Sequence, residues 1–66
     1  MKLTVNGETR DVPAPMTVLG LVGSLGLSPA KIAVERNLEI VPRSAYGEVA
    51  LGEGDRIEIV NFVGGG

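Results

Sequence analysis

Residues 56–63 read RIEIVNFV, which is the clearest strand-forming segment of the 66-residue chain. Because successive side chains of a strand point to opposite faces, Ile57 and Ile59 share one face while Val60 and Phe62 share the other. We expect Ile57 and Ile59 to lie in the core, beneath a helix. Val60 and Phe62 then form an exposed contact surface. The alternative is a strand that bulges after Ile59, so that Phe62 folds back over the core.

The start of the chain predicts a β-hairpin. Residues 2–5 alternate between polar and apolar side chains, as a half-buried strand does. Asn6-Gly7 follows, and this pair favours a type I′ turn, in which both central residues need a positive φ. The return strand, residues 8–12, has few apolar side chains, so we place it at a sheet edge.

The next segment predicts one short helix. Thr17 is a suitable N-cap, and Gly26 can supply the left-handed residue that ends the helix. Apolar residues recur between them at the spacing of one helical face: Val18, Leu21, Val22 and Leu25. Gly20 and Gly23 each weaken the helix by about 1 kcal/mol relative to Ala, and they would let either the sheet or a partner approach closely.

The remaining segments complete an α+β layer. We expect strands at residues 32–34, 38–41 and, briefly at an edge, 48–51, with polar turns at 35–37 and 52–55. Several strands with one helix favour a mixed sheet of four to five strands with the helix packed across it. The first and last strands have the best core patterns, so we place them side by side and parallel at the centre, as in a ubiquitin-like β-grasp fold.

The last strand runs directly into Gly64, Gly65 and Gly66. We predict a β-grasp domain at residues 1–63 and a flexible glycine tail at 64–66. The tail is either a frayed end or linker, or an arm whose terminal carboxylate at Gly66 is the reactive group. Without a Cβ, three extended glycines can thread a narrow channel and reach about 10 Å from the fold.

Composition excludes several other functions. The chain has no cysteine and no histidine, so it lacks a thiol nucleophile, a disulfide and the usual general base at neutral pH. Its net charge of −2, its single Tyr and its single Phe argue against nucleic-acid binding. No apolar run approaches the length of a membrane span, and residues 1–4 lack the apolar core of a signal peptide. We therefore expect a cytoplasmic protein that is not an enzyme and binds no cofactor or metal.

These features together resemble the ubiquitin-like β-grasp sulfur carriers, and within that group the carriers of thiamine biosynthesis. The resemblance covers essentially the whole chain and rests on several segments in order. They are residues 5–7 (VNG), 32–37 (IAVERN), 40–43 (IVPR), 54–60 (GDRIEIV) and 62–66 (FVGGG).

The resemblance implies a role as a substrate of other enzymes. A ThiF-like adenylyltransferase would use ATP and magnesium to adenylate Gly66, and a persulfide sulfur from a cysteine desulfurase would replace AMP to give a thiocarboxylate. Thiazole synthase, ThiG, would then take the sulfur. The resemblance assigns threading to Gly65, with Gly64 as a spacer, and partner binding to Val60, Phe62 and Val63. A free carrier must expose its tail, which favours a monomer.

Four alternatives share part of this pattern. The sulfur carrier of molybdopterin synthase has the same fold, tail and activation chemistry. A carrier for tRNA thiolation, or a ubiquitin-like modifier that ends in an isopeptide bond, would also use Gly66. A plain β-grasp interaction module would make no use of the tail.

Overall fold

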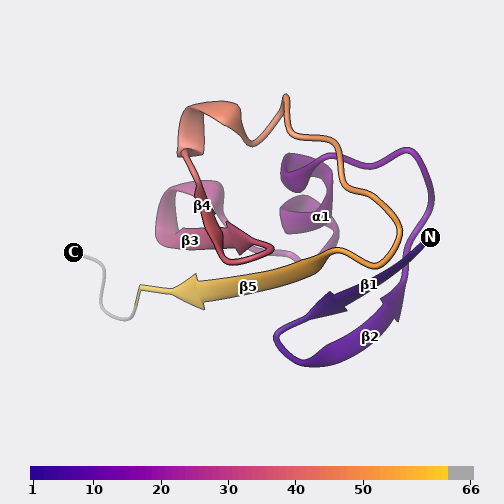
Figure 1. Cartoon of the computed structure of the whole chain (residues 1–66). Coiled ribbons are helices and arrows are strands. Elements are labelled where there is room, and N and C mark those ends of the chain that lie inside the picture. The colour runs from indigo at the N-terminus through magenta and orange to yellow at the C-terminus, as the bar shows by residue number, and fades with distance from the viewer. Residues whose placement is uncertain (63–66) are drawn as a thin grey trace.

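The computed structural model describes residues 1–62. It contains five strands, one α-helix and two short 3-10 segments (Figure 1). The elements are β1 (Lys2–Val5), β2 (Glu8–Asp11), α1 (Val18–Ser24), η1 (Pro29–Lys31), β3 (Ile32–Arg36), β4 (Glu39–Val41), η2 (Arg43–Ala45) and β5 (Arg56–Asn61). Val63 and the predicted glycine tail lie outside the described residues.

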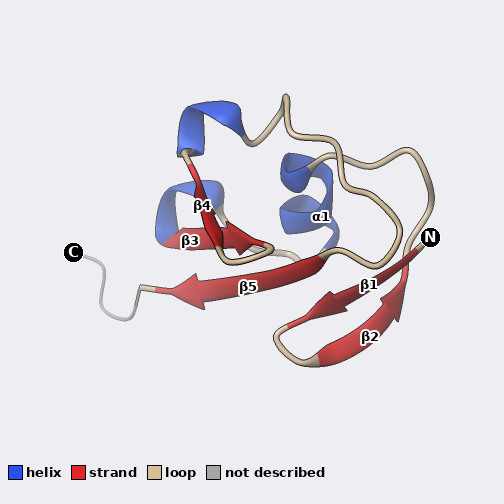
Figure 2. Ribbon diagram, in the orientation of Figure 1, coloured by secondary structure: helices blue, strands red, loops and turns tan. Residues whose placement is uncertain are grey.

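The strands form one mixed sheet in the order β2-β1-β5-β3-β4. β1 and β5 pair in parallel at its centre, with Val5 beside Ile57, while every other pairing is antiparallel. Figure 2 shows α1 and both 3-10 segments on the same side of β1 and β5. The predicted α+β, ubiquitin-like β-grasp architecture is confirmed.

The first hairpin forms as predicted. Asn6 and Gly7 have φ values of 50° and 82°, as a type I′ turn requires. β2 is exposed along its whole length and lies at one edge of the sheet. Its low apolar content therefore predicted its position correctly.

Helix α1 begins and ends as predicted. The Thr17 side chain accepts a hydrogen bond from the Gly20 N–H at 3.1 Å. At the other end Gly26 has a φ of 73°, and the Leu27 N–H donates to the Val22 carbonyl, which is a Schellman ending. The helix has only seven residues, so it depends on packing of its buried face rather than on its own propensity.

The two helix glycines do not mediate contact with the sheet. Both are exposed. A Cβ on Gly23 would meet no atom within 4 Å, and one on Gly20 would meet only the side chains of Met16 and Thr17. Of the two predicted reasons for these glycines, close approach to the sheet is therefore wrong.

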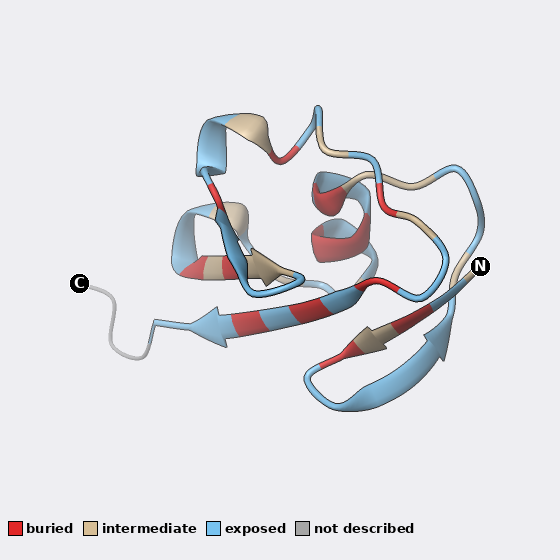
Figure 3. Ribbon diagram, in the orientation of Figure 1, coloured by how far each residue is buried: buried red, intermediate tan, exposed pale blue. Residues whose placement is uncertain are grey.

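The core lies between α1 and one face of the sheet. Ile57 and Ile59 are buried, and their neighbours along β5 are exposed, so burial alternates along this strand as predicted (Figure 3). The buried apolar side chains of the described residues are Leu3, Val5, Val18, Leu21, Val22, Ile32, Val34, Val41, Tyr46, Leu51, Ile57 and Ile59.

The predicted edge strand at residues 48–51 is wrong. This segment joins no strand of the sheet and makes one isolated bridge, between Thr17 and Ala50. Two of its backbone bonds lead to the start of the helix instead: the Val18 N–H donates to the Val49 carbonyl, and the Leu51 N–H donates to the Met16 carbonyl. The segment therefore crosses above the core and ties the N-terminus of α1 in place.

The polar turn predicted at residues 35–37 begins two residues later, at Asn37. Strand β3 continues through Arg36, and the turn is formed by Asn37 and Leu38, which have φ values of 51° and 71°. A left-handed Leu is unfavourable by itself. The Asn37 side chain stabilises the turn, because it accepts a hydrogen bond from the Arg56 N–H and donates one to Asp55.

Asp55 is a buried carboxylate with three donors around it. The Gly52 N–H, the Arg36 Nε and the Asn37 Nδ2 lie 2.7, 2.8 and 3.1 Å from its oxygens. Burial disfavours the charged form, but these hydrogen bonds and the Arg36 charge outweigh it and hold the pKa of Asp55 below its ordinary value. This cluster joins the β3–β4 turn to the loop that precedes β5.

Candidate functional site

The last described residues present apolar side chains on the outer face of the sheet, away from α1. Val60 is 59% exposed and Phe62 is 47% exposed. The Phe62 N–H donates to the Lys31 carbonyl at 2.8 Å, so the backbone at Phe62 continues the β5–β3 ladder. The structure therefore places Phe62 on the exposed outer face rather than folded onto the core, and the contact role of this surface stays a prediction.

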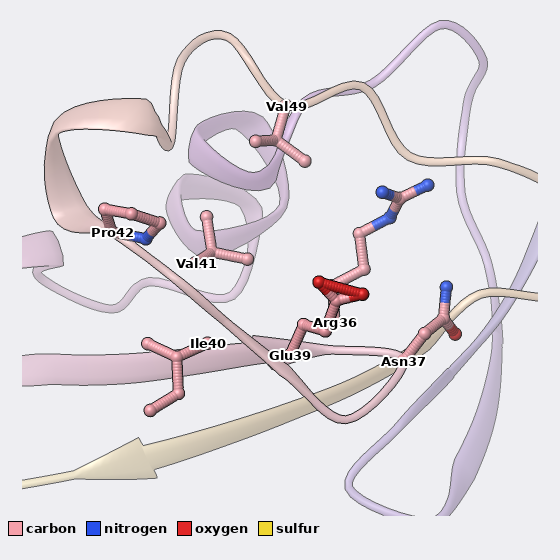
Figure 4. Close-up of a pocket in the computed structure, with 7 residues that line it drawn as sticks. All are labelled: Arg36, Asn37, Glu39, Ile40, Val41, Pro42 and Val49. Carbon is pink, nitrogen blue, oxygen red and sulfur yellow. The ribbon is translucent and has the colours of Figure 1, made fainter.

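Two neighbouring strands extend this surface. Ala33 of β3 is the register partner of Val60, and Ile40 of β4 is 77% exposed. Figure 4 shows Val41 pointing toward the helix and Ile40 pointing the opposite way. We call Ala33, Ile40, Val60 and Phe62 the outer patch. Sequence reasoning placed Ile40 in a strand but missed its exposure, which the burial of Val41 and strand alternation could have indicated.

The outer patch has an acidic border. Glu35 of β3 lies opposite Glu58 of β5 on one side and opposite Ile40 of β4 on the other. Like charges placed directly opposite each other destabilise a sheet slightly. A partner that brings a cationic group to this border would therefore gain electrostatically as well as from the apolar contact.

The Asn6 side chain holds the end of β5 from the side of the sheet where β1 lies. Its Nδ2 donates to the Ile59 carbonyl at 3.2 Å, and its Oδ1 accepts from the Ile59 N–H at 2.7 Å. These two side-chain bonds take the place of the next main-chain hydrogen bonds between β1 and β5, beyond the end of β1. Sequence reasoning assigned Asn6 only to the turn and missed this second role.

The described residues hold no evident catalytic centre. The pocket of Figure 4 has a volume of about 210 Å³ and lies between the β3–β4 hairpin and Val49. Its one basic side chain, Arg36, already pairs with Asp55. Within residues 1–62 no three Asp or Glu side chains cluster as metal ligands would, and no helix is long and apolar enough to cross a membrane.

The sequence was then compared with known families. The sequence model described as the ThiS family matches residues 3–66, which is nearly the whole chain. The chain belongs to the ThiS family. This result favours the thiamine branch predicted from the sequence over the other sulfur carriers and modifiers.

The relatives include a free-standing ThiS and two larger proteins. The chain is 48% identical over 50 residues to the sulfur carrier protein ThiS of Bacillus subtilis, covering 76% of each. It is 59% identical to a thiazole synthase of Paramagnetospirillum magneticum and 50% identical to one of Magnetococcus marinus, in both cases over all 66 residues. The chain spans only 20% of the length of each of these two thiazole synthases.

A solved member of the ThiS family has the same fold. The crystal structure of the thiamine biosynthesis protein ThiS from Geobacter metallireducens aligns with a TM-score of 0.83 at 35% identity, covering 100% of both chains. The predicted tail residues Gly64, Gly65 and Gly66, and the predicted contact residue Val63, lie outside the described residues. Their roles stay predictions.

Proposed function

We propose that this chain is a sulfur carrier of thiamine biosynthesis that works in the cytoplasm as a monomer and as a substrate of other enzymes. The observation that carries the proposal is the match of the ThiS family to residues 3–66, which includes the glycine end. The absence of cysteine from the sequence supports it, because the chain has no thiol of its own to hold sulfur.

The proposed chemistry takes place at the carboxylate of Gly66. A ThiF-like enzyme joins this carboxylate to the AMP part of magnesium-bound ATP and releases pyrophosphate. A persulfide derived from a cysteine desulfurase then attacks the carbonyl carbon and displaces AMP, which leaves an acyl disulfide. A second thiol attacks the outer sulfur of that S–S bond and releases the thiocarboxylate. ATP and magnesium belong to the activating enzyme and not to this chain.

We assign the acceptor as thiazole synthase, ThiG. Two relatives named thiazole synthase contain a region similar to the whole of this chain. Two activities that share one polypeptide are held at a high effective concentration, which suits a carrier and the enzyme that consumes its cargo. The separate chain would reach the same enzyme through the outer patch.

A mass measurement tests the proposed function. The 66-residue chain, incubated with ATP, magnesium, the activating enzyme and a persulfide donor, should gain the mass difference between one sulfur and one oxygen atom. Fragmentation should place this gain on Gly66. Folded chain that stays at its original mass with demonstrably active partners would contradict the proposal. So would protein isolated from its native cells in which further residues follow Gly66.

A second test concerns the outer patch. Replacing Phe62 by Asp should weaken binding to the activating enzyme about 30-fold, the effect expected of an aromatic side chain at the centre of an interface. Binding would be measured by calorimetry. The matched control is T9D, which adds the same charge to an exposed strand position away from the outer patch. Because Phe62 is half exposed, the melting temperature should change little, and a large fall would support a core role instead.

A further inference from the structure

Strand β5 is longer than its parallel neighbour and leaves one edge open. Within residues 1–62, β1 pairs with β5 only at Arg56 and Ile57, whereas β5 continues to Asn61. Figure 1 shows the end of β5 running past the tip of the β1–β2 hairpin, while β3 lies along its other side. The part of β5 that β1 leaves uncovered ends at Asn61, directly before the residues that lead to Gly66.

The backbone of Asn61 faces this open edge. Along a strand, the N–H and C=O groups of alternate residues point to opposite sides. Phe62 donates to Lys31 on the β3 side, while Ile57 accepts from the Asn6 N–H on the β1 side. Ile59 is bonded on that same side by the Asn6 side chain. The N–H of Asn61 points to the same side as the N–H of Ile59, by the same alternation. No described residue accepts a hydrogen bond from it.

A groove lies beside the open edge. It has a volume of about 400 Å³ and runs between the tip of the hairpin, the end of α1 and the end of β5. Its apolar lining comes from Val5, Leu25, Leu27 and Ile59, and Asn6, Glu8, Arg10 and Asn61 form its polar part. An extended segment placed along Asn61 would direct every second side chain into this groove.

We propose that an extended segment of thiazole synthase adds to the open edge of β5 as a further strand and hydrogen-bonds to the backbone of Asn61. This inference rests on the proposed function. The atoms of Gly66 lie at most about 18 Å from Asn61 along an extended chain, so the enzyme that holds Gly66 must stand next to this edge. Addition of a strand to an exposed edge uses main-chain hydrogen bonds for affinity and neighbouring pockets for specificity.

Thiazole synthase suits this edge better than a second copy of the chain. A second copy bound along Asn61 would occupy the space beside the outgoing tail and would block the enzyme. The two thiazole synthase relatives each contain a region that matches this chain over its full length. The edge and the outer patch lie on the same end of β5, so one partner can use both.

Proline substitution tests the role of the Asn61 N–H. Asn61→Pro removes this N–H without breaking a hydrogen bond among the described residues, and proline is tolerated where a strand N–H is unpaired. The variant should bind thiazole synthase about tenfold more weakly than the wild type, the effect of losing one buried hydrogen bond. Asn61→Ala removes only the side chain, which lines the groove, and keeps the N–H, so Asn61→Pro should bind about tenfold more weakly than Asn61→Ala as well.

Hydrogen exchange gives a readout that needs no variant. In the complex of the 66-residue chain with thiazole synthase, exchange of the Asn61 amide should slow at least about tenfold relative to the free chain. The Phe62 amide, already bonded to Lys31, serves as the internal reference.

Unchanged exchange at Asn61, or equal binding by N61P and the wild type, would overturn the inference and leave the proposed function intact. An equal loss in N61A and N61P would assign the effect to the side chain and also overturn it. Wild-type chain that accepts sulfur but does not bind thiazole synthase would overturn both this inference and the assigned acceptor.

Discussion

A chain that lacks Gly65 and Gly66 is expected to accept no sulfur, although it folds normally. In the proposed chemistry the new terminal carboxylate would belong to Gly64, about 7 Å short of the position that the activating enzyme reaches for. A shift of even 1 Å in a reacting group can cost about a hundredfold in rate. We therefore expect the thiocarboxylate to fall below detection by intact mass.

The same deletion should leave stability unchanged. Every buried apolar side chain of the described residues lies between Leu3 and Ile59, so the core is complete before the glycines begin. Melting followed by circular dichroism should agree with the wild type within about 2 °C, since no core contact is removed. Deletion of Gly64 alone keeps the Gly-Gly end but shortens the arm by about 3.5 Å, so it should also accept less sulfur while its melting temperature stays unchanged. Undiminished sulfur acceptance by the chain without Gly65 and Gly66 would show that Gly66 is not the carrier residue.

The largest effect on stability is expected for Asp55→Ala. This change removes the acceptor of three hydrogen bonds and leaves Arg36 and Asn37 without their partner. Breaking a buried ion pair costs roughly 3–5 kcal/mol. The Arg36 side chain is 37% exposed and can regain water, so we expect about 3 kcal/mol. For a domain of this size the melting temperature should then fall by roughly 12–24 °C.

The pH dependence identifies the ionised carboxylate as the cause. The pKa of Asp55 is lower in the folded chain than its ordinary value of 3.8. Its stabilising contribution is therefore complete above about pH 5 and is lost as the pH falls through the folded pKa. The difference in unfolding free energy between the wild type and D55A should shrink in the same range, as measured by urea denaturation.

An exposed ion pair provides the control for this prediction. Asp11 lies 3.5 Å from Lys2, and both side chains are largely exposed. D11A should change the unfolding free energy by no more than about 0.5 kcal/mol, because solvent screens such pairs. A D55A variant as stable as D11A would show that the Asp55 cluster does not hold the loop before β5.

Most of the fold followed from local patterns in the sequence. The Asn6-Gly7 turn, the caps of α1 and the alternation along β5 each depend on neighbouring residues, so each could be predicted. The exact position of the turn after β3 could not, because Asn37 is held by Asp55 and Arg56, which lie 18 and 19 residues away. Residues 48–51 have strand-like composition, but their backbone bonds go to Ala45 and to residues 16–18 rather than to a strand.

The features of the candidate site were likewise only partly predictable from the sequence. By itself the sequence determined the ThiS-family membership, the absence of a thiol and the glycine end, because these depend only on which residues are present and in what order. Only the tertiary structure decided that Phe62 stays on the outer face, that Ile40 joins it there, and that the backbone of Asn61 faces an open edge. Each of these depends on strands that are distant in the chain, since pairing between β3, β4 and β5 sets which side chains meet and where a neighbouring strand ends.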